Sequence, residues 1–438
     1  MIKPDLKYIK ERKRIGVIYG LLILMICING FLSAFVVSTL IRCIQLLSLI
    51  IIIYNEYKLW RMGSLQLPRG FSKFALMCLF ALIIGIIVRG EWNLTMHYFL
   101  LKLLGFSGFL PYLLPFLILP LPNSRHLDTI KKRFFVGAIL SCPLWIINIG
   151  QLVQDDFHAE GVGSYMPFFA AFLLGFPFVT KSNRKICFGI WLFYLMLMVL
   201  NARRNMVFSL TCYGLIAYYC CNISKFAKRR MQGILLTVLA VVMVLLFVAP
   251  NIDFISEHVF SRFSNRLGED TRSGVEKLFF LDFSRSPIED WIWGRGLDGG
   301  YYQEMRNPIT GELETNRLGI ETGYLNNILK GGVLYASFMV VVMLVCLIRS
   351  IKIKNIYSVY LRLVFLMFFV DLYSTVFMGY FGVKSVLFWF CVSIAMSREY
   401  PYLGQAGLAV CQNENSKTQK SILCNNRSHI GRVSYRSC

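Results

Sequence analysis

Charged residues are scarce in this sequence. Asp, Glu, Lys and Arg together make up 16% of the 438 residues, whereas hydrophobic residues make up 56%. A soluble globular domain carries about 25% charged residues, so the composition excludes an ordinary soluble protein. The 46 bases outnumber the 24 acids, but they are spread through short segments between apolar runs. That pattern is typical of membrane topology, and we expect no nucleic-acid partner.

Metal-binding and disulfide motifs are also missing. The five histidines are scattered, the thirteen cysteines include no Cys-x-x-Cys pair, and the segments expected outside the membrane contain no Asp-x-Asp triplet. Most cysteines lie in apolar runs or near the end of the chain, which is typical of packing residues. The sequence therefore predicts no metal, no other cofactor and no disulfide framework.

Long hydrophobic runs are what the sequence contains instead. A membrane-spanning helix needs about 20 mainly apolar residues, and counting such runs predicts an all-α, polytopic integral membrane protein with about 12 transmembrane helices. The fourth run contains Lys102 and several prolines, so we expect a bent or broken helix there. The predicted spans are 15–37, 38–54, 71–88, 98–121, 134–153, 164–180, 186–200, 206–221, 233–249, 321–348, 358–378 and 383–397.

The positions of Lys and Arg predict the orientation of these spans. With a cytoplasmic N-terminus, the five short inner loops hold 18 bases and the five short outer loops hold five, namely Arg42, Arg89, Arg203, Arg204 and Lys384. Short cytoplasmic loops are enriched in bases, so we expect both termini to be cytoplasmic. The chain then divides into helices 1–9 (1–249), a long outer loop with short helices (250–320), helices 10–12 (321–397) and a disordered cytoplasmic tail (398–438).

Two adjacent arginines, Arg203 and Arg204, lie between apolar runs in "LNARRNMVF". A charge at the centre of a membrane helix costs roughly 2.5–3.5 kcal/mol, and less near an interface. Both side chains could simply extend to lipid phosphates. The alternative is that at least one points inward and binds an anion, because the planar guanidinium donates two parallel hydrogen bonds to a phosphate.

The long outer loop contains the segment "GVEKLFFLDFSRSPIEDWIWGRGLDGGYY". Its apolar spacing predicts a short helix, and "SPIED" predicts the start of another. "GRGLDGG" is backbone that could approach a ligand closely. The loop holds more acids than bases, so we expect most of its arginines to form ion pairs. A loop of this length is usually functional or disordered, and its aromatic content favours a folded lid.

Polar residues open the tenth predicted span in "IETGYLNNILKGG". Helical spacing predicts that Glu321, Tyr324 and Asn327 lie near one face. Glu321 either caps the helix, where a carboxylate is favoured by the helix dipole, or acts as a general base near the membrane surface.

Asp371 is a lone acid within the eleventh predicted span. Carboxylates inside a membrane are often functional. The alternative is a purely structural ion pair, with Lys330, Lys384 or one of the two adjacent arginines as the partner.

Three short motifs in the range 160–348 carry a resemblance. They are "NARRN" after an apolar span, Arg272 ahead of "SPIEDWIWGRGLDGGYY", and "IETGYLNNILKGG". In order, spacing and expected location this pattern resembles the O-antigen ligase/polymerase (Wzy/WaaL-like) family of membrane glycosyltransferases. The chain has Ala202 where the family commonly has serine. Ligases usually have a histidine where Glu321 stands, so the resemblance favours a polymerase.

The resemblance implies a polymerase of surface polysaccharide repeat units, such as O-antigen, capsule or exopolysaccharide. Glycan would pass from undecaprenyl pyrophosphate to an acceptor repeat unit at the outer face of the bacterial inner membrane. Fixed arginines in a low-dielectric site stabilise the charge of a departing pyrophosphate. The residues implied as catalytic are Arg203, Arg272 and Glu321, and those implied as substrate-binding are Arg204, Arg266, Tyr324 and Asp371.

The implied partners are the undecaprenyl-pyrophosphate-linked oligosaccharide, the lipid bilayer and a chain-length regulator. Two alternative functions remain open on the sequence. One is an O-antigen ligase, which differs in its acceptor. The other is a lipid-linked glycan flippase or another 12-helix transporter, although the two halves of the chain show no visible similarity and a single long outer loop is unusual for that class.

Overall fold

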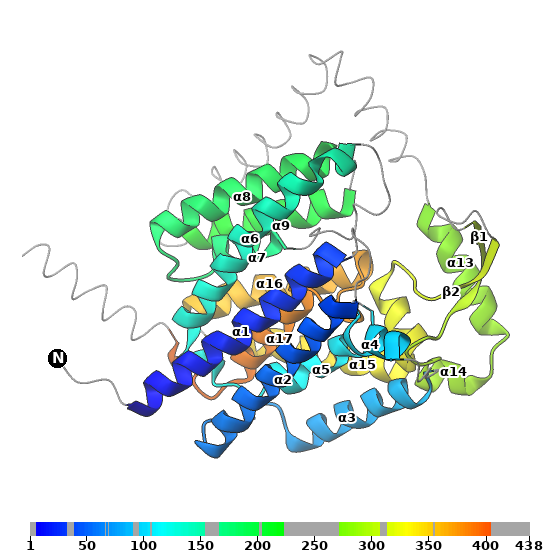
Figure 1. The fold of residues 1–438 in the computed structure, drawn as a ribbon, viewed down its shortest axis with the longest axis horizontal. Coiled ribbons are helices and arrows are strands. Elements are labelled where there is room, and N and C mark those ends of the chain that lie inside the picture. Colours follow the sequence, from blue (N-terminus) through cyan, green and yellow to red (C-terminus); the bar gives the residue numbers. More distant parts are fainter. Residues whose placement is uncertain are drawn as a thin grey trace, which may run out of the picture.

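The computed structural model describes residues 6–32, 39–65, 67–68, 70–90, 96–105, 107–153, 166–200, 204–222, 271–306, 313–353 and 355–403. The described chain is mostly helical (Figure 1). The α-helices are α1 (Leu6–Leu32), α2 (Thr39–Arg61), α3 (Lys73–Val88), α4 (Met96–Leu104), α5 (Leu110–Ile118), α6 (Leu127–Val153), α7 (Phe168–Gly175), α8 (Lys181–Leu200), α9 (Arg204–Asn222), α13 (Thr271–Ser284), α14 (Ile288–Trp293), α15 (Gly323–Lys352), α16 (Ile356–Ser374) and α17 (Val383–Met396).

Two short 3₁₀ helices and one pair of strands complete the described elements. The 3₁₀ helices are η1 (Asn123–Arg125) and η4 (Tyr400–Tyr402). The strands β1 (Tyr301–Arg306) and β2 (Leu313–Arg317) pair antiparallel, with Tyr301 opposite Arg317 and Arg306 opposite Leu313. The prediction of an all-α protein is therefore correct for the bundle and wrong for this hairpin, where one face of β1 packs on α13.

Three described helices are long and apolar enough to cross a membrane: Leu40–Arg61, Gly323–Lys352 and Ile356–Tyr373. Shorter apolar helices cover Lys73–Val88, Met206–Cys221 and Val383–Met396. These helices support an integral membrane protein. They give fewer clear spans than the twelve that hydropathy predicts, and the ninth predicted span, 233–249, lies outside the described residues.

Two predicted spans differ from simple transmembrane helices. The fourth divides into α4 and α5, as its prolines and Lys102 led us to expect. The sixth is reduced to α7, whose eight residues are all buried. A helix of that length extends about 12 Å, which is too short to cross the roughly 30 Å hydrocarbon core of a bilayer.

The centre of the bundle is α17. All 14 of its residues are buried, and it contacts α5, α7, α15 and α16. Apart from Lys384 and two serines, its sequence is apolar around the whole helix, which is typical of a helix enclosed by others. Aromatic rings dominate its surroundings, with Phe390 meeting Phe134, Phe172 and Phe176 at centroid distances between 5.1 and 6.2 Å.

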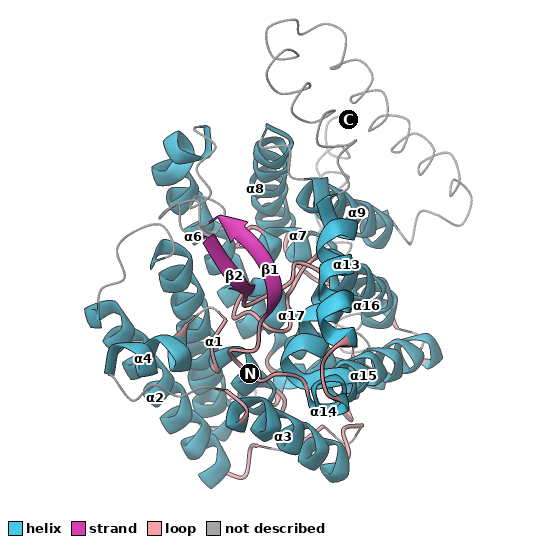
Figure 2. Cartoon of the chain, turned by 90° about the vertical axis from the view of Figure 1, so that its right-hand side faces the viewer, coloured by secondary structure: helices cyan, strands magenta, loops and turns pink. Residues whose placement is uncertain are grey.

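The described part of the predicted outer loop forms a compact unit on one side of the bundle. Figure 2 shows α13, α14 and the hairpin on the side of the bundle that faces the viewer. A small hydrophobic core joins this unit to α15, and its buried members are Phe279, Phe283, Tyr301, Ile320, Leu325 and Leu329. The described residues of this segment include the two short helices α13 and α14 and an aromatic core.

Candidate functional site

Helix α15 is broken at Gly332, and the loop is attached to the bundle by hydrogen bonds at this break. Gly332 has φ +70° inside the helix, a conformation that favours glycine. Such a break frees helix carbonyls, which need other partners within a membrane protein. The Arg295 N–H donates to the Leu329 carbonyl at 2.7 Å, and the Gly296 N–H donates to the Lys330 carbonyl at 3.1 Å. The loop backbone therefore completes the hydrogen bonding of the broken helix.

The glycines of residues 294–300, which we call the clasp, permit this close approach. Gly294 has φ +72°, and a Cβ there would lie 2.5 Å from the Gly331 backbone nitrogen. Gly296 has φ +82°, and its Cβ would lie 2.6 Å from the backbone of Arg89. The sequence led us to expect close approach to a ligand. The backbone that the clasp approaches is instead the protein's own, at α15 and at the end of α3.

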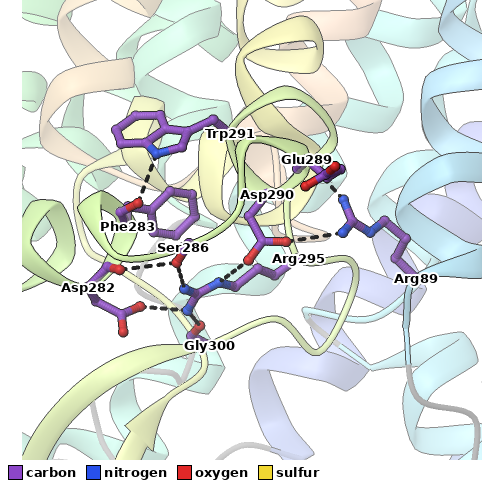
Figure 3. Close-up of polar contacts among 9 residues, drawn as sticks. All are labelled: Arg89, Asp282, Phe283, Ser286, Glu289, Asp290, Trp291, Arg295 and Gly300. Atoms are coloured by element: carbon purple, nitrogen blue, oxygen red, sulfur yellow. Dashed lines mark hydrogen bonds and ion pairs between the residues drawn. The ribbon is translucent and has the colours of Figure 1, made fainter.

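Arg295 fixes the clasp from the loop side (Figure 3). Its Nη1 lies 2.6 Å from Asp282 Oδ2 and donates to the Gly300 carbonyl at 2.5 Å, while its Nε donates to Asp290 Oδ2 at 3.1 Å. Its Nη2 donates to Ser286 Oγ. One guanidinium therefore joins α13, α14 and the clasp, and these contacts occupy it fully.

Three further cations tie the loop to the bundle. Arg89, directly after α3, lies 3.1 Å from Asp290. Lys102 of α4 lies 2.6 Å from Asp298 in the clasp. Lys330 is buried and donates to two clasp carbonyls at 2.8 and 2.9 Å. The clasp thus attaches the loop to the bundle, and these cations stabilise the fold by binding groups of the protein.

A second polar group lies where α15 begins, and we call it the rim: Glu276, Gln303, Arg317, Glu321 and Thr322. Thr322 Oγ1 donates to Glu276 Oε1 at 2.8 Å, which links α15 to α13. Arg317 donates to Gln303 Oε1 at 3.1 Å and to Glu321 Oε1 at 3.3 Å. The Glu321 side chain is 66% exposed, so it is accessible from outside the bundle.

Tyr301 lies beside the rim and contributes a hydroxyl. Its side chain packs in the loop core, and its hydroxyl donates to Gln303 Oε1 at 2.9 Å. Burial raises the pKa of Tyr301, and the neighbouring Arg317 opposes that effect. The phenol is therefore protonated at neutral pH and acts as a hydrogen-bond donor.

Tyr324 is in the first turn of α15 and stacks on Tyr373 of α16, with ring centroids 6.2 Å apart. The prediction that Glu321, Tyr324 and Asn327 share a helix face is wrong. The helix begins only at Gly323, so Glu321 lies before it and is exposed. Asn327 is buried and contacts the sulfur of a methionine in the core.

Asp371 is buried deep in the bundle and forms an ion pair with Lys384 at 2.9 Å. Ser209 of α9 donates to the same carboxylate oxygen at 3.0 Å. Lys384 is thus confirmed as the partner among those the sequence allowed. The other oxygen, Oδ2, is buried and has no hydrogen-bond partner within the described part of the chain.

The structure brings several predicted site residues to one end of the bundle. Ser209 lies five residues after Arg204, the first residue of α9, which is about 7.5 Å along a helix. Ser209 contacts Asp371, near the end of α16. That end of α16 meets the start of α15, where a Cβ on Gly323 would touch the Leu372 and Thr375 carbonyls. The first turn of α9 and the rim are therefore at the same end.

The remaining predicted residues are placed only partly. Arg203 and Arg266 lie outside the described residues. Arg204 begins α9 and Arg272 is the second residue of α13, but their side chains also lie outside the described part. Arg272 is one helical turn before Glu276, which contacts Thr322, so its backbone is close to the rim.

Sequence reasoning missed Arg317, Gln303 and Thr322 as parts of this site. Arg317 and Glu321 are four residues apart, a spacing that would have indicated a pair if the segment had been predicted as helical. Gln303 joins them only because the hairpin places β1 beside β2, and nothing in the local sequence marks that contact.

Comparison with known proteins adds no family assignment. No protein-family model matches the chain, and a search of curated proteins finds no match.

Proposed function

We propose that this protein is a membrane glycosyltransferase that polymerises repeat units of a surface polysaccharide. The donor is a glycan on undecaprenyl pyrophosphate, and the reaction occurs at the outer face of the bacterial inner membrane. The full arrangement has about 12 spans and both termini in the cytoplasm. The sequence resemblance suggests this activity, and the acceptor distinguishes it from the ligase alternative.

The observation that carries the proposal is the convergence of three segments at one end of the bundle. These are the first turn of α9, the first turn of α13 and the rim at the start of α15. They bear Arg204, Arg272 and Glu321, and Arg203 immediately precedes α9. One reaction would require these residues, which are far apart in sequence, to act on the same substrate. Their location at one end of the bundle is compatible with that requirement.

The distribution of bases supports the proposed orientation. Arg42 was counted in an outer loop, but it lies within α2, is buried, and donates to Asn29 and Gln45. Lys384 was counted there as well and is buried in α17. Without these two, the short outer loops hold only Arg89, Arg203 and Arg204, which increases the asymmetry between the two sides.

In the proposed reaction a hydroxyl of the acceptor repeat unit attacks the anomeric carbon of the donor. The bond between that carbon and the pyrophosphate oxygen breaks as the new glycosidic bond forms, and undecaprenyl pyrophosphate leaves. Arg203 and Arg272 bind the pyrophosphate, with Arg204 and Arg266 as further contacts. Glu321 accepts the hydroxyl proton or orients the acceptor, and Tyr324 borders the site. Asp371, the other implied substrate contact, is buried behind it in an ion pair with Lys384.

Substitution of the two arginines tests the proposal. Arg203→Ala and Arg272→Ala should each abolish polymer on the cell surface while single repeat units and normal protein levels persist. Arg285→Ala is the matched control, because Arg285 follows α13 directly and is exposed. Surface glycan is separated by size on gels, and protein is measured by immunoblotting of membranes. Polymer of normal length in both test variants would refute the assigned pyrophosphate site.

The buried Asp371–Lys384 pair favours a second candidate, a transporter of lipid-linked glycan. Ionisable residues inside membrane proteins often mark translocation or proton pathways, and Asp371 Oδ2 is free of partners among the described residues. Deleting the gene separates the functions. Loss of a polymerase leaves single repeat units on the surface, loss of a ligase leaves lipid-linked glycan unattached outside, and loss of a flippase leaves lipid-linked units inside.

A further inference from the structure

A basic cavity lies between α1 and α2, at the end of the bundle away from the loop. Its volume is about 560 Å³, and its lining residues are Lys10, Lys13, Arg14, Val17, Asn55, Lys58, Arg61 and Met62. In Figure 1 the start of α1 and the end of α2 are at the left, whereas the loop unit is at the right. The cavity is therefore distinct from the candidate catalytic site.

The sequence builds this cavity from one face of each helix. Residues 10, 13, 14 and 17 follow the i, i+3, i+4, i+7 spacing on α1, and residues 55, 58 and 62 follow a similar spacing on the antiparallel α2. Five of the eight lining residues are cations and none is acidic. Such a concentration of like charge is unfavourable unless an anion neutralises it.

The cations lack internal carboxylate partners. Among the described residues, no ion pair involves Lys10, Lys13, Arg14, Lys58 or Arg61. Arg14 Nη1 donates to the Asn55 side chain at 3.2 Å, and its Nε is buried with no hydrogen-bond partner in the part of the chain that the structure describes. The nearby carboxylate of Glu11 is already engaged by Ser64 and His126.

The surface of α2 beside the cavity is apolar. Leu47, Ile50 and Tyr54 are each more than half exposed, and they continue at helical spacing into Lys58 and Arg61. Trp60 is 64% exposed, and exposed Tyr and Trp are enriched where a bilayer meets water. An anion bound here would thus have its charge among the cations and an apolar surface directly below it.

We propose that this cavity binds the phosphate headgroup of an anionic phospholipid, whose acyl chains lie along the Leu47–Ile50–Tyr54 stripe. The cations bind the phosphate, and Val17 contacts the glycerol region. Basic pockets between transmembrane helices are suited to such headgroups. The lipid joins α1 to α2 at the interface and serves as a bound structural partner, independent of the proposed glycosyl transfer.

Native mass spectrometry of the detergent-purified protein tests this binding. Phosphatidylglycerol and phosphatidylcholine are titrated separately, and the affinity of each is measured. We expect retention of phosphatidylglycerol over phosphatidylcholine. Lys13→Gln/Lys58→Gln should weaken phosphatidylglycerol binding by roughly 30-fold, since each base near a membrane surface contributes to attraction of anionic lipid. Both lysines are outside the Arg14–Asn55 contact, so the helix pair should remain folded.

Lys132→Gln/Lys185→Gln is the matched control, since both lysines are exposed and outside the cavity and the charge change is identical. It should leave phosphatidylglycerol binding unchanged. Lys10→Gln/Arg61→Gln provides a second test of the cavity, and size-exclusion elution checks the fold of each variant. Equal binding of the two lipids, an equal loss in the control, or complete displacement of phosphatidylglycerol by inorganic phosphate would each overturn the proposal.

Discussion

The loop unit and the α1–α2 cavity use their cations differently. At the loop end, Arg89, Arg295 and Arg317 each lie within 3.3 Å of a carboxylate. At the opposite end, five cations line the α1–α2 cavity with no carboxylate among them. A cation engaged by an internal acid stabilises the fold, whereas one without such a partner can bind an external anion. The pyrophosphate site proposed at the loop end must therefore use other arginines.

The largest expected effect on stability comes from removing the Arg295 guanidinium, which forms ion pairs in the loop unit. Arg295→Ala would leave Asp282 and Asp290 half-buried without this partner, so we expect a loss of roughly 3 kcal/mol in the free energy of unfolding. The segment around the clasp should also become sensitive to chymotrypsin, which can cleave after Trp293 and Tyr301. Thermal unfolding in detergent and limited proteolysis measure the two effects.

Arg285→Ala is the control for this change, because its side chain is exposed on the same segment. It should alter neither measurement. If Arg295→Ala unfolded at the temperature of the unmodified protein, the guanidinium would not be what holds the loop unit together.

The next effect in size comes from the helix break. In Gly332→Ala the new Cβ would lie 2.1 Å from the Ile292 carbonyl oxygen at φ +70°, so we expect a loss of about 2 kcal/mol. Gly189→Ala is a fair comparison, since its Cβ would meet nothing within 4 Å and alanine favours a helix by about 1 kcal/mol. Equal unfolding temperatures for the two variants would contradict a tight contact at the break.

A smaller, pH-dependent effect is expected at the cavity end. Burial lowers the pKa of His126 below 6.5, although Glu11 opposes this and the nearby Arg125 and Arg12 add to it. The unfolded chain therefore binds a proton more readily than the folded protein does. The stability that neutral His126 provides is present above pH 6.5 and is lost as the pH falls.

Between pH 7 and pH 5, the unfolding temperature of the His126→Asn variant should therefore fall less than that of the unmodified protein. Thermal unfolding of both proteins across this range is the measurement. A steeper decline in the variant would show that the Glu11 interaction outweighs burial.

The smallest effect on stability is expected at Glu321. The Glu321 carboxylate in its ion pair with Arg317 is 66% exposed, and pairs screened by solvent contribute about 0–1 kcal/mol. Glu321→Gln should therefore leave the unfolding temperature nearly unchanged while it reduces polymer formation. Glu289→Gln, another exposed acid of the loop, should affect neither. A large drop in stability for Glu321→Gln would assign the carboxylate a structural role.

Hydropathy and charge predicted the features that depend on individual segments. The helical membrane class, the broken fourth run and the ion pairing expected for most loop arginines follow from local composition and the cost of an unpaired charge. For Asp371 the sequence left Lys330, Lys384 and the two adjacent arginines open, and only the structure identifies Lys384. Features that depend on which segments meet could not be predicted. The same glycines in residues 294–300 would serve a ligand or a helix backbone equally well, and only the fold decides that α15 is the partner.

The count of membrane spans shows the same limit. An apolar run indicates that a segment is buried away from water. It does not distinguish a segment buried in the protein interior from one that faces the lipid bilayer. The short α7 and the wholly enclosed α17 are apolar because other helices surround them. For the same reason Arg42 and Lys384 were assigned to loops, since polar partners within the bundle are invisible in a hydropathy count.

The contact between the clasp and α15 also constrains how the chain is assembled. Residues 294–296 leave the ribosome before residues 329–332, so their amides must wait for carbonyls that are synthesised later. The first part of α15, up to the break at Gly332, and the clasp can therefore reach their final arrangement only together, after the helix has left the insertion machinery. A truncation between the two would leave both with unsatisfied backbone groups and expose each to quality-control proteases.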